Sequence, residues 1–242
     1  GSVSFATATG VMGAERIIDG LLLMIILGVT LPLGHPLDPL PDHIGKLPIP
    51  VVAVPATAYM TLVVFMAAFA AMALFYWRRA FARNLTEKVF GLVSKRLAKL
   101  LADQVEKLSE GFRFLPSTKH VVPYFLETLV YWATSAFGMY LLLWGCGVPG
   151  ISFAQACAVM GVLGIGIIAP GAPGYFGAFQ GSIYAGLALY FGEEVVFGPG
   201  AAYVFLFYVL QLSGVFLLSI IALILDRDIG RQATSAEAWQ KP

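Results

Sequence analysis

Five prolines and glycines gathered within eight residues constrain this chain more than any other feature. They are Pro170, Gly171, Pro173, Gly174 and Gly177. They separate two apolar runs, 153–169 and 178–192, each shorter than the ~20 residues that a helix needs to cross a bilayer. Lipid cannot form hydrogen bonds with the backbone amides and carbonyls that a broken helix leaves unpaired. At membrane depth such a segment must therefore be buried in protein or line a wet cavity. In transporters such broken helices mark a midplane binding site, and the pattern favours a carrier of a polar group.

The composition is that of an integral membrane protein. Hydrophobic residues make up 59% of the 242 residues and charged residues 12%, and the mean hydropathy is +0.82, far above that of soluble proteins. Cys146 and Cys157 are too few for a disulfide framework and are expected to be free thiols. The histidines have no metal-ligand spacing and no dinucleotide fingerprint follows a strand, so we expect no metal, no cofactor and no nucleic-acid partner.

The hydropathy pattern predicts an all-α polytopic protein with about six membrane segments. The expected segments are 16–33, 55–77, 121–145, 153–169, 178–192 and 201–225. The pattern leaves open whether the two short runs each cross the membrane or form a re-entrant pair. Residues 1–225 are interpreted as one transmembrane domain and 226–242 as a polar cytoplasmic tail.

Basic residues are concentrated in one connection. Residues 78–120 hold ten of the fifteen lysines and arginines, whereas the proline-rich loop 34–54 holds one. The positive-inside rule therefore predicts that 78–120 and both termini are cytoplasmic. Within this connection, 89–108 has apolar residues at helical spacing and lysines opposite, which predicts an interfacial helix on an anionic leaflet surface.

Charged residues inside the expected spans are the candidates for chemistry. Glu15, Arg16 and Asp19 share one helical face at the cytoplasmic start of the first span, where a salt-bridged cluster could form. Glu127 lies about two turns inside the third span, where a carboxylate is costly without a partner. The cluster at 15–19 is either a headgroup or gating site or an interfacial charge anchor. Glu127 is either a functional carboxylate, a residue near enough to the interface to stay wet, or a structural partner of a basic side chain.

The broken segment itself offers two opposite dipoles. If one half-helix ends before Pro170 and another begins near Gln180, free carbonyls lie on one side and free amides on the other. The amide end would suit a phosphate and the carbonyl end an amine. The simpler interpretation is a kinked hairpin without a ligand. Gly161 and Gly164, upstream, are interpreted as close-packing positions.

The order of these motifs resembles a known family. An E-R-x-x-D opening, Glu15 to Asp19, is followed by an amphipathic middle region. A P-x-x-P-G-x-x-G run follows, from Pro170 to Gly177. Together they resemble the transmembrane region of lysylphosphatidylglycerol synthases and their stand-alone flippase-like relatives, over about residues 3–225. The resemblance implies an inner-membrane protein that moves a lipid or lipid-linked molecule between leaflets.

Three departures from the family pattern limit what the resemblance implies. Gln180 stands where the family often has Glu, so an acid role does not carry over. Further hydrophobic helices precede the E-R-x-x-D motif in family members, and we expect the native chain to have them. No aminoacyl-transfer domain follows residue 225, so synthase activity is not expected.

The leading hypothesis is therefore a lipid translocase rather than an enzyme. The headgroup would pass along a groove lined by Arg16, Asp19, Glu127 and the 170–180 segment, while the tails stay in the bilayer. Three alternatives remain: a non-transporting partner in envelope-lipid assembly, a membrane enzyme that modifies lipids, and a carrier of ions or small solutes. Oligomerisation is compatible with each.

Overall fold

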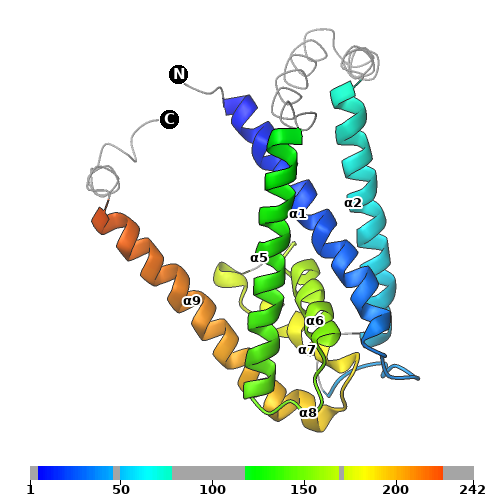
Figure 1. Cartoon of the computed structure of the whole chain (residues 1–242). Coiled ribbons are helices and arrows are strands. Elements are labelled where there is room, and N and C mark those ends of the chain that lie inside the picture. Colours follow the sequence, from blue (N-terminus) through cyan, green and yellow to red (C-terminus); the bar gives the residue numbers. More distant parts are fainter. Residues whose placement is uncertain (1–4, 46–49, 78–117, 169–171, 226–242) are drawn as a thin grey trace.

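The computed structural model describes residues 5–45, 50–77, 118–168 and 172–225 (Figure 1). Within these ranges the protein is helical and has no β-sheet, as the sequence predicts. The helices are α1 (Phe5–Leu33), α2 (Val54–Trp77), α5 (Thr118–Gly145), α6 (Phe153–Gly166), α7 (Ala178–Ala188), α8 (Glu193–Phe197) and α9 (Pro199–Leu225). Two short 3₁₀ helices, η1 (Val51–Ala53) and η2 (Pro173–Tyr175), precede α2 and α7. The predicted interfacial helix 89–108 and the tail 226–242 lie outside the described residues.

Four helical stretches are long and apolar enough to cross a membrane. They are Val11–Leu33, Val51–Ala73, Val122–Gly145 and Glu193–Leu225. They coincide with four of the six predicted segments. The other two correspond to α6 and α7, whose 14 and 11 residues are about 21 and 16 Å long, less than the ~30 Å hydrocarbon core.

Helices α6 and α7 form a hairpin that enters and leaves the bundle at the same end without reaching the other end, and it is called re-entrant here in that sense. At the start of α6, Gln155 Nε2 donates to Gly34 O over 3.0 Å. At the end of α7, Tyr190 Oη donates to Leu31 O over 3.0 Å, and Leu189 O accepts from the Leu37 amide over 2.8 Å. Both ends of the hairpin are thus anchored to the same end of α1. The turn between them lies between the two ends of the long helices (Figure 1).

The start of α6 is fixed by its own sequence. Ser152 Oγ accepts from the Gln155 amide at 3.2 Å, while Gln155 Oε1 accepts from the Ser152 amide at 2.9 Å. This capping box satisfies two backbone donors at the first turn. Gln155 therefore both begins the hairpin and, through its Nε2, ties it to α1.

Glycines let the hairpin approach α1 closely, as predicted for Gly161 and Gly164. A Cβ at Gly161 would meet the Leu27 side chain, and one at Gly164 would meet Leu23. Backbones that approach this closely gain van der Waals contact, which drives helix association in lipid. The contacts also fix the antiparallel register of α6 on α1, because successive turns of one helix meet successive turns of the other.

Among the described residues, helix α9 packs against the bundle mainly through its first three turns. Its first turns bury Gly200, Tyr203 and Val204, while most residues after Tyr208 are exposed. Figure 1 shows α9 separating from α5 as it runs back toward the end of the bundle at which α1 begins. The two helices therefore meet near α8 and diverge from there.

Candidate functional site

The hairpin turn has a backbone shape that favours glycine. Gly174 has φ +69° and Gly177 has φ +89°, both in the region that L side chains rarely adopt. Tyr175 also lies there, with φ +56°, which is uncommon for a residue with a Cβ. These angles end η2 and turn the chain into α7. Pro170 and Gly171, the other members of the predicted motif, lie outside the described residues.

The first turn of α7 carries amides without partners. The Gly177 amide donates to Gln180 Oε1 at 2.7 Å, so Gln180 caps its own helix. The next amides, of residues 178–180, find no acceptor among the described residues. Such a helix start attracts anions, because its amides and the helix dipole both favour negative charge. The predicted amide end therefore exists, with Gln180 as part of its cap.

The turn is held against α9 by an aromatic cluster that the sequence analysis did not identify. Tyr208 Oη donates to Gly174 O at 3.0 Å. The Tyr208 ring lies 5.2 Å from that of Phe179 and 6.1 Å from that of Phe176, between ring centroids. The signal in the sequence was weak, because Tyr208 is one aromatic among several in an apolar helix.

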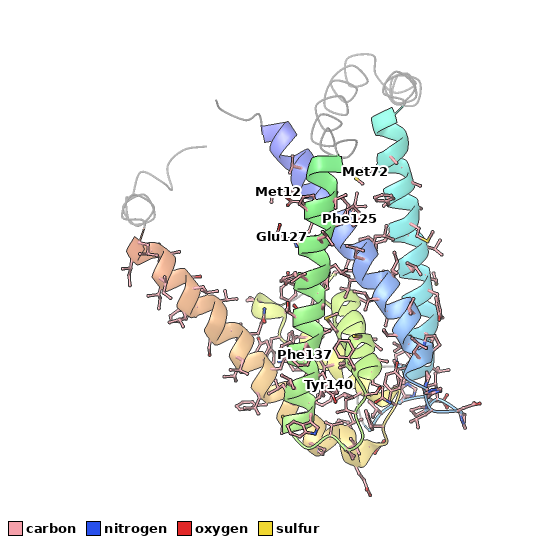
Figure 2. The ribbon with its side chains drawn as sticks, in the orientation of Figure 1. Met12, Met72, Phe125, Glu127, Phe137 and Tyr140 are labelled. Carbon is pink, nitrogen blue, oxygen red and sulfur yellow. The ribbon has the colours of Figure 1, made fainter. Side chains whose placement is uncertain are left out.

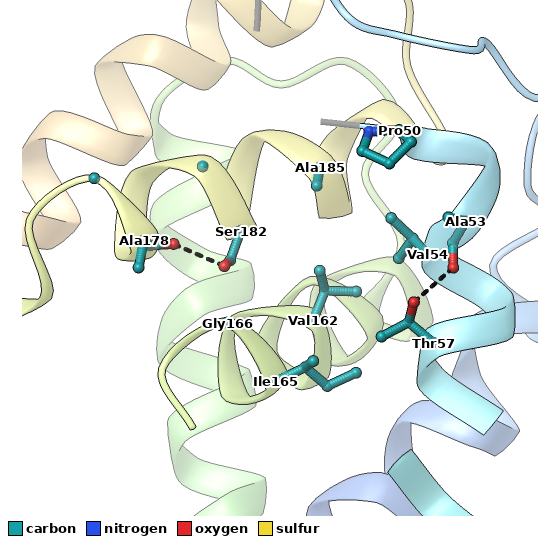
Figure 3. Close-up of a pocket in the computed structure, with 12 residues that line it drawn as sticks. Pro50, Ala53, Val54, Thr57, Val162, Ile165, Gly166, Ala178, Ser182 and Ala185 are labelled. Carbon is teal, nitrogen blue, oxygen red and sulfur yellow. Dashed lines mark hydrogen bonds between the residues drawn. The ribbon is translucent and has the colours of Figure 1, made fainter. Parts of the chain in front are cut away.

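A cavity of about 400 Å³ lies on the other side of the hairpin, against the start of α2 (Figure 3). Its walls come from the residues before and within the first turn of α2, the last turns of α6 and the first turns of α7. They are Pro50, Ala53, Val54, Thr57, Val162, Ile165, Gly166, Gly177, Ala178, Gly181, Ser182 and Ala185. The walls are mostly apolar. The two hydroxyls among them donate to their own helices, Thr57 to Ala53 O at 2.9 Å and Ser182 to Ala178 O at 2.7 Å.

Asp19 has a partner, although not the expected one. Tyr124 Oη of α5 donates to Asp19 Oδ1 at 3.2 Å, and the carboxylate is half-buried. Arg16 and Glu15 are exposed, and no ion pair joins them to each other or to Asp19 in the structure. The predicted salt-bridged cluster is therefore not formed. A tyrosine donor on a second helix stabilises the carboxylate instead, and no sequence pattern indicates a pair of residues 105 positions apart.

The register of α6 on α1 places Asp19 near the carbonyl end of the hairpin. Gly164 packs on Leu23, one helical turn from Asp19, so Asp19 lies about 6 Å further along α1, close to the level at which α6 ends. Carbonyls at a helix end favour a cation. The carboxylate and the carbonyl end of α6 thus lie at the same level of the bundle, and both favour a cation.

Glu127 lies apart from both groups. It is exposed in the upper part of α5, closer than Phe137 and Tyr140 to the end where α5 begins (Figure 2). Phe125, two residues earlier, packs against α1 and α2, so Glu127 faces about 200° away from them. The cavity beside α7 is lined by none of Arg16, Asp19 and Glu127. The cavity at the amide end is thus not lined by any of the three charged residues that the sequence predicts in one groove with the turn.

Comparison with known proteins identifies one family. The family model described as the lysylphosphatidylglycerol synthase TM region matches residues 1–219. Neither the comparison with curated proteins nor that with solved structures gave a match.

Proposed function

Because the chain belongs to the lysylphosphatidylglycerol synthase TM-region family and is a multi-pass membrane protein, we propose that it moves a lipid or lipid-linked molecule between leaflets. The observation that carries this proposal is the re-entrant hairpin. Its turn lies within the bundle, and the unpartnered amides of α7 begin at a 400 Å³ cavity. Broken helices with such ends are the usual form of a transporter binding site.

The proposed site has two parts, of which one favours an anion and the other a cation. The amide end of α7 suits the phosphate that phospholipids and many lipid-linked molecules carry. Asp19 and the carbonyl end of α6 suit an amine or a proton, and Arg16 lies about one turn from Asp19 at the edge of the bundle. A headgroup that carries both charges would meet both preferences on its way past the hairpin. Its apolar tails would remain in the bilayer.

The proposed setting is a bacterial inner membrane with both termini in the cytoplasm. The basic connection 78–120 would then lie on the anionic leaflet, where each near-surface Lys or Arg contributes about 1 kcal/mol. The substrate, in this proposal, is drawn from that same leaflet. No catalytic chemistry is needed for movement between leaflets.

A leaflet-resolved assay tests the proposal. The full chain is reconstituted into vesicles with a headgroup-labelled phosphatidylglycerol, and a membrane-impermeant reductant reports how much label reaches the outer leaflet. Gly177→Val distorts the start of α7, because φ +89° is strained for valine although its Cβ would meet no atom. We expect this variant to lose movement of the labelled lipid.

Gly147→Val is the matched control. Gly147 has φ +82°, also has open space for a Cβ, and lies in the turn between α5 and α6, at the other end of the hairpin. It imposes the same kind of backbone strain without touching the proposed site. Equal movement in protein-free vesicles and in vesicles with the unaltered chain would refute translocation and leave a non-transporting role.

A further inference from the structure

A groove between α5 and α9 is separate from the cavity beside α7. It has a volume of about 630 Å³ and is walled by Gly138 and Leu141 of α5 and by Leu210, Gln211, Gly214 and Leu218 of α9. We propose that this groove binds an acyl chain of a membrane phospholipid, with the Gln211 amide bonded to the polar end of that lipid. The inference rests on the proposed function, for which the groove would be the lateral entrance.

The groove is open because the protein does not fill it with its own side chains. An added Cβ at Gly138 or at Gly214 would meet no heavy atom within 4 Å. Leu210 and Leu218 are 57% and 66% exposed. The two glycines lie in the groove wall and leave it wider than larger side chains would. Figure 1 shows α5 and α9 diverging from their common end near α8.

Gln211 is the polar feature of this groove. It is the thirteenth of the 27 residues of α9, a helix whose spanning stretch has a mean hydropathy of 2.4. Its side chain is exposed and has no hydrogen-bond partner in the described part of the chain. An amide left unpaired in hydrocarbon is costly, so it calls for a ligand with acceptors. The ester carbonyls and phosphate of a phospholipid provide them.

The size of the groove favours a lipid chain over a helix. A helix is ~10 Å wide, so it would fill a 630 Å³ space in about 8 Å, or one and a half turns. A spanning segment of ~20 residues would therefore lie mostly outside the groove. A thin acyl chain can follow the groove along its length.

The hairpin turn contacts α9 in the same region of the helix that lines the groove. On α9, Tyr208 bonds to Gly174 O, and a Cβ at Gly174 would lie 3.6 Å from Leu212. Gln211, which lines the groove, lies between these two positions in sequence. A lipid held at Gln211 would therefore have its polar end at the level of α9 that contacts the turn.

The groove also points toward Glu127. Gly138 follows Glu127 by eleven residues, which is three helical turns plus about 20°, so both lie on one face of α5, about 16 Å apart along its axis. Glu127 thus stands above the groove on the side where α9 diverges. The polar end of an entering lipid would meet Glu127 before it reaches Gln211.

Photolabelling tests this site directly. The full chain is placed in nanodiscs of phosphatidylcholine with a trace of phosphatidylglycerol that carries a diazirine on one acyl chain, and adducts are mapped by mass spectrometry. We expect adducts concentrated at Leu141 and Leu210. Gly138→Leu and Gly214→Leu should lower them severalfold by filling the groove. Gly145→Leu, also in open space on α5 but outside the groove, should leave them unchanged.

A separate variant tests the role of Gln211. Gln211→Leu should reduce labelling by the phospholipid probe but not by a hydrocarbon that carries the same diazirine chain without a headgroup. Two results would overturn the inference. One is adducts at the groove no more frequent than on lipid-facing residues of α2 such as Met60, and the other is labelling unaffected by either groove-filling variant.

This experiment is independent of transport. Selective labelling without movement of lipid would uphold the groove and refute the translocase. Movement of lipid without selective labelling would uphold the translocase and refute the groove.

Discussion

Tyr208 Oη lies 3.0 Å from the carbonyl oxygen of Gly174, so a side chain of α9 holds the turn of the re-entrant hairpin. The two residues are 34 positions apart. Helix α9 contributes little else to the bundle beyond its first turns, because most of its later residues face outward. This bond and the surrounding rings are therefore the main link between α9 and the turn, which makes their energetic coupling measurable.

Tyr208→Phe and Gly174→Ala should be strongly non-additive. Tyr208→Phe removes a hydrogen bond and should cost about 1 kcal/mol of unfolding free energy. Gly174→Ala places a Cβ 3.1 Å from Tyr208 Oη and also strains φ, so it should cost more. Because the phenylalanine removes the crowding oxygen, the double variant should lose less than the sum, by about 0.5 kcal/mol or more. Denaturant titrations in detergent give the cycle, and simple additivity would contradict the contact.

Asp19 should depend on Tyr124 more than on Arg16. Tyr124→Phe leaves a half-buried carboxylate without its donor and should destabilise the protein by about 1–3 kcal/mol. Arg16→Ala should cost less than about 0.5 kcal/mol, because Arg16 is exposed and forms no ion pair with the described residues. Tyr59→Phe is the control, since its bond to Gly28 O is long, at 3.4 Å, and exposed. Thermal unfolding in one detergent ranks the three variants, and a larger loss from Arg16→Ala would reverse the assignment.

Gly161 and Gly13 should respond oppositely to alanine. A Cβ at Gly161 would clash with Leu27, so Gly161→Ala should push α6 off α1 and cost about 1–3 kcal/mol. Gly13 is helical and has nothing within 4 Å of an added Cβ, so Gly13→Ala should stabilise by up to about 1 kcal/mol. The measurement is again unfolding free energy. A stabilising Gly161→Ala would show that the two helices are not in contact there.

Cysteine labelling tests the orientation of the protein in the membrane. In a chain whose native Cys146 and Cys157 are replaced by alanine, Lys95→Cys should react with an impermeant maleimide only from the cytoplasm. Glu194→Cys, in α8 at the opposite end of the bundle, should react only from outside. The reason is the excess of basic residues in 78–120. Labelling of position 95 from outside would invert the proposed topology.

Local sequence patterns predicted where the helices lie. They did not predict the contacts between residues far apart in the sequence. Long apolar stretches and clustered prolines mark where helices begin and end, so α2 was predicted to within one residue at its start. Gly161 and Gly164 were also predicted, because small residues in apolar helices have few uses other than packing. The re-entry was not determined, because two crossings and none leave the termini on the same sides. The evidence for it is the shortness of α6 and α7, with 14 and 11 residues, and the position of their turn between the two ends of the long helices (Figure 1).

The candidate site was harder to predict for the same reason. The sequence indicated Asp19, Glu127 and the turn as single features, and charge alone suggested that Arg16 would pair with Asp19. The actual partner of Asp19 is a tyrosine on another helix, and the carboxylate of Glu127 turns away from the core. Which face a residue presents depends on how two helices cross, and no pattern within one helix records that.

The re-entrant hairpin also sets the thickness of the barrier that a polar cargo would meet. Helix α6 is about 21 Å long, and it starts at the end of the bundle opposite to Asp19. In the proposed transport, a hairpin of this length along the membrane normal would extend through about two thirds of a ~30 Å hydrocarbon layer. A headgroup that arrives from the Asp19 side would then meet the hairpin only after it has passed roughly a third of that layer.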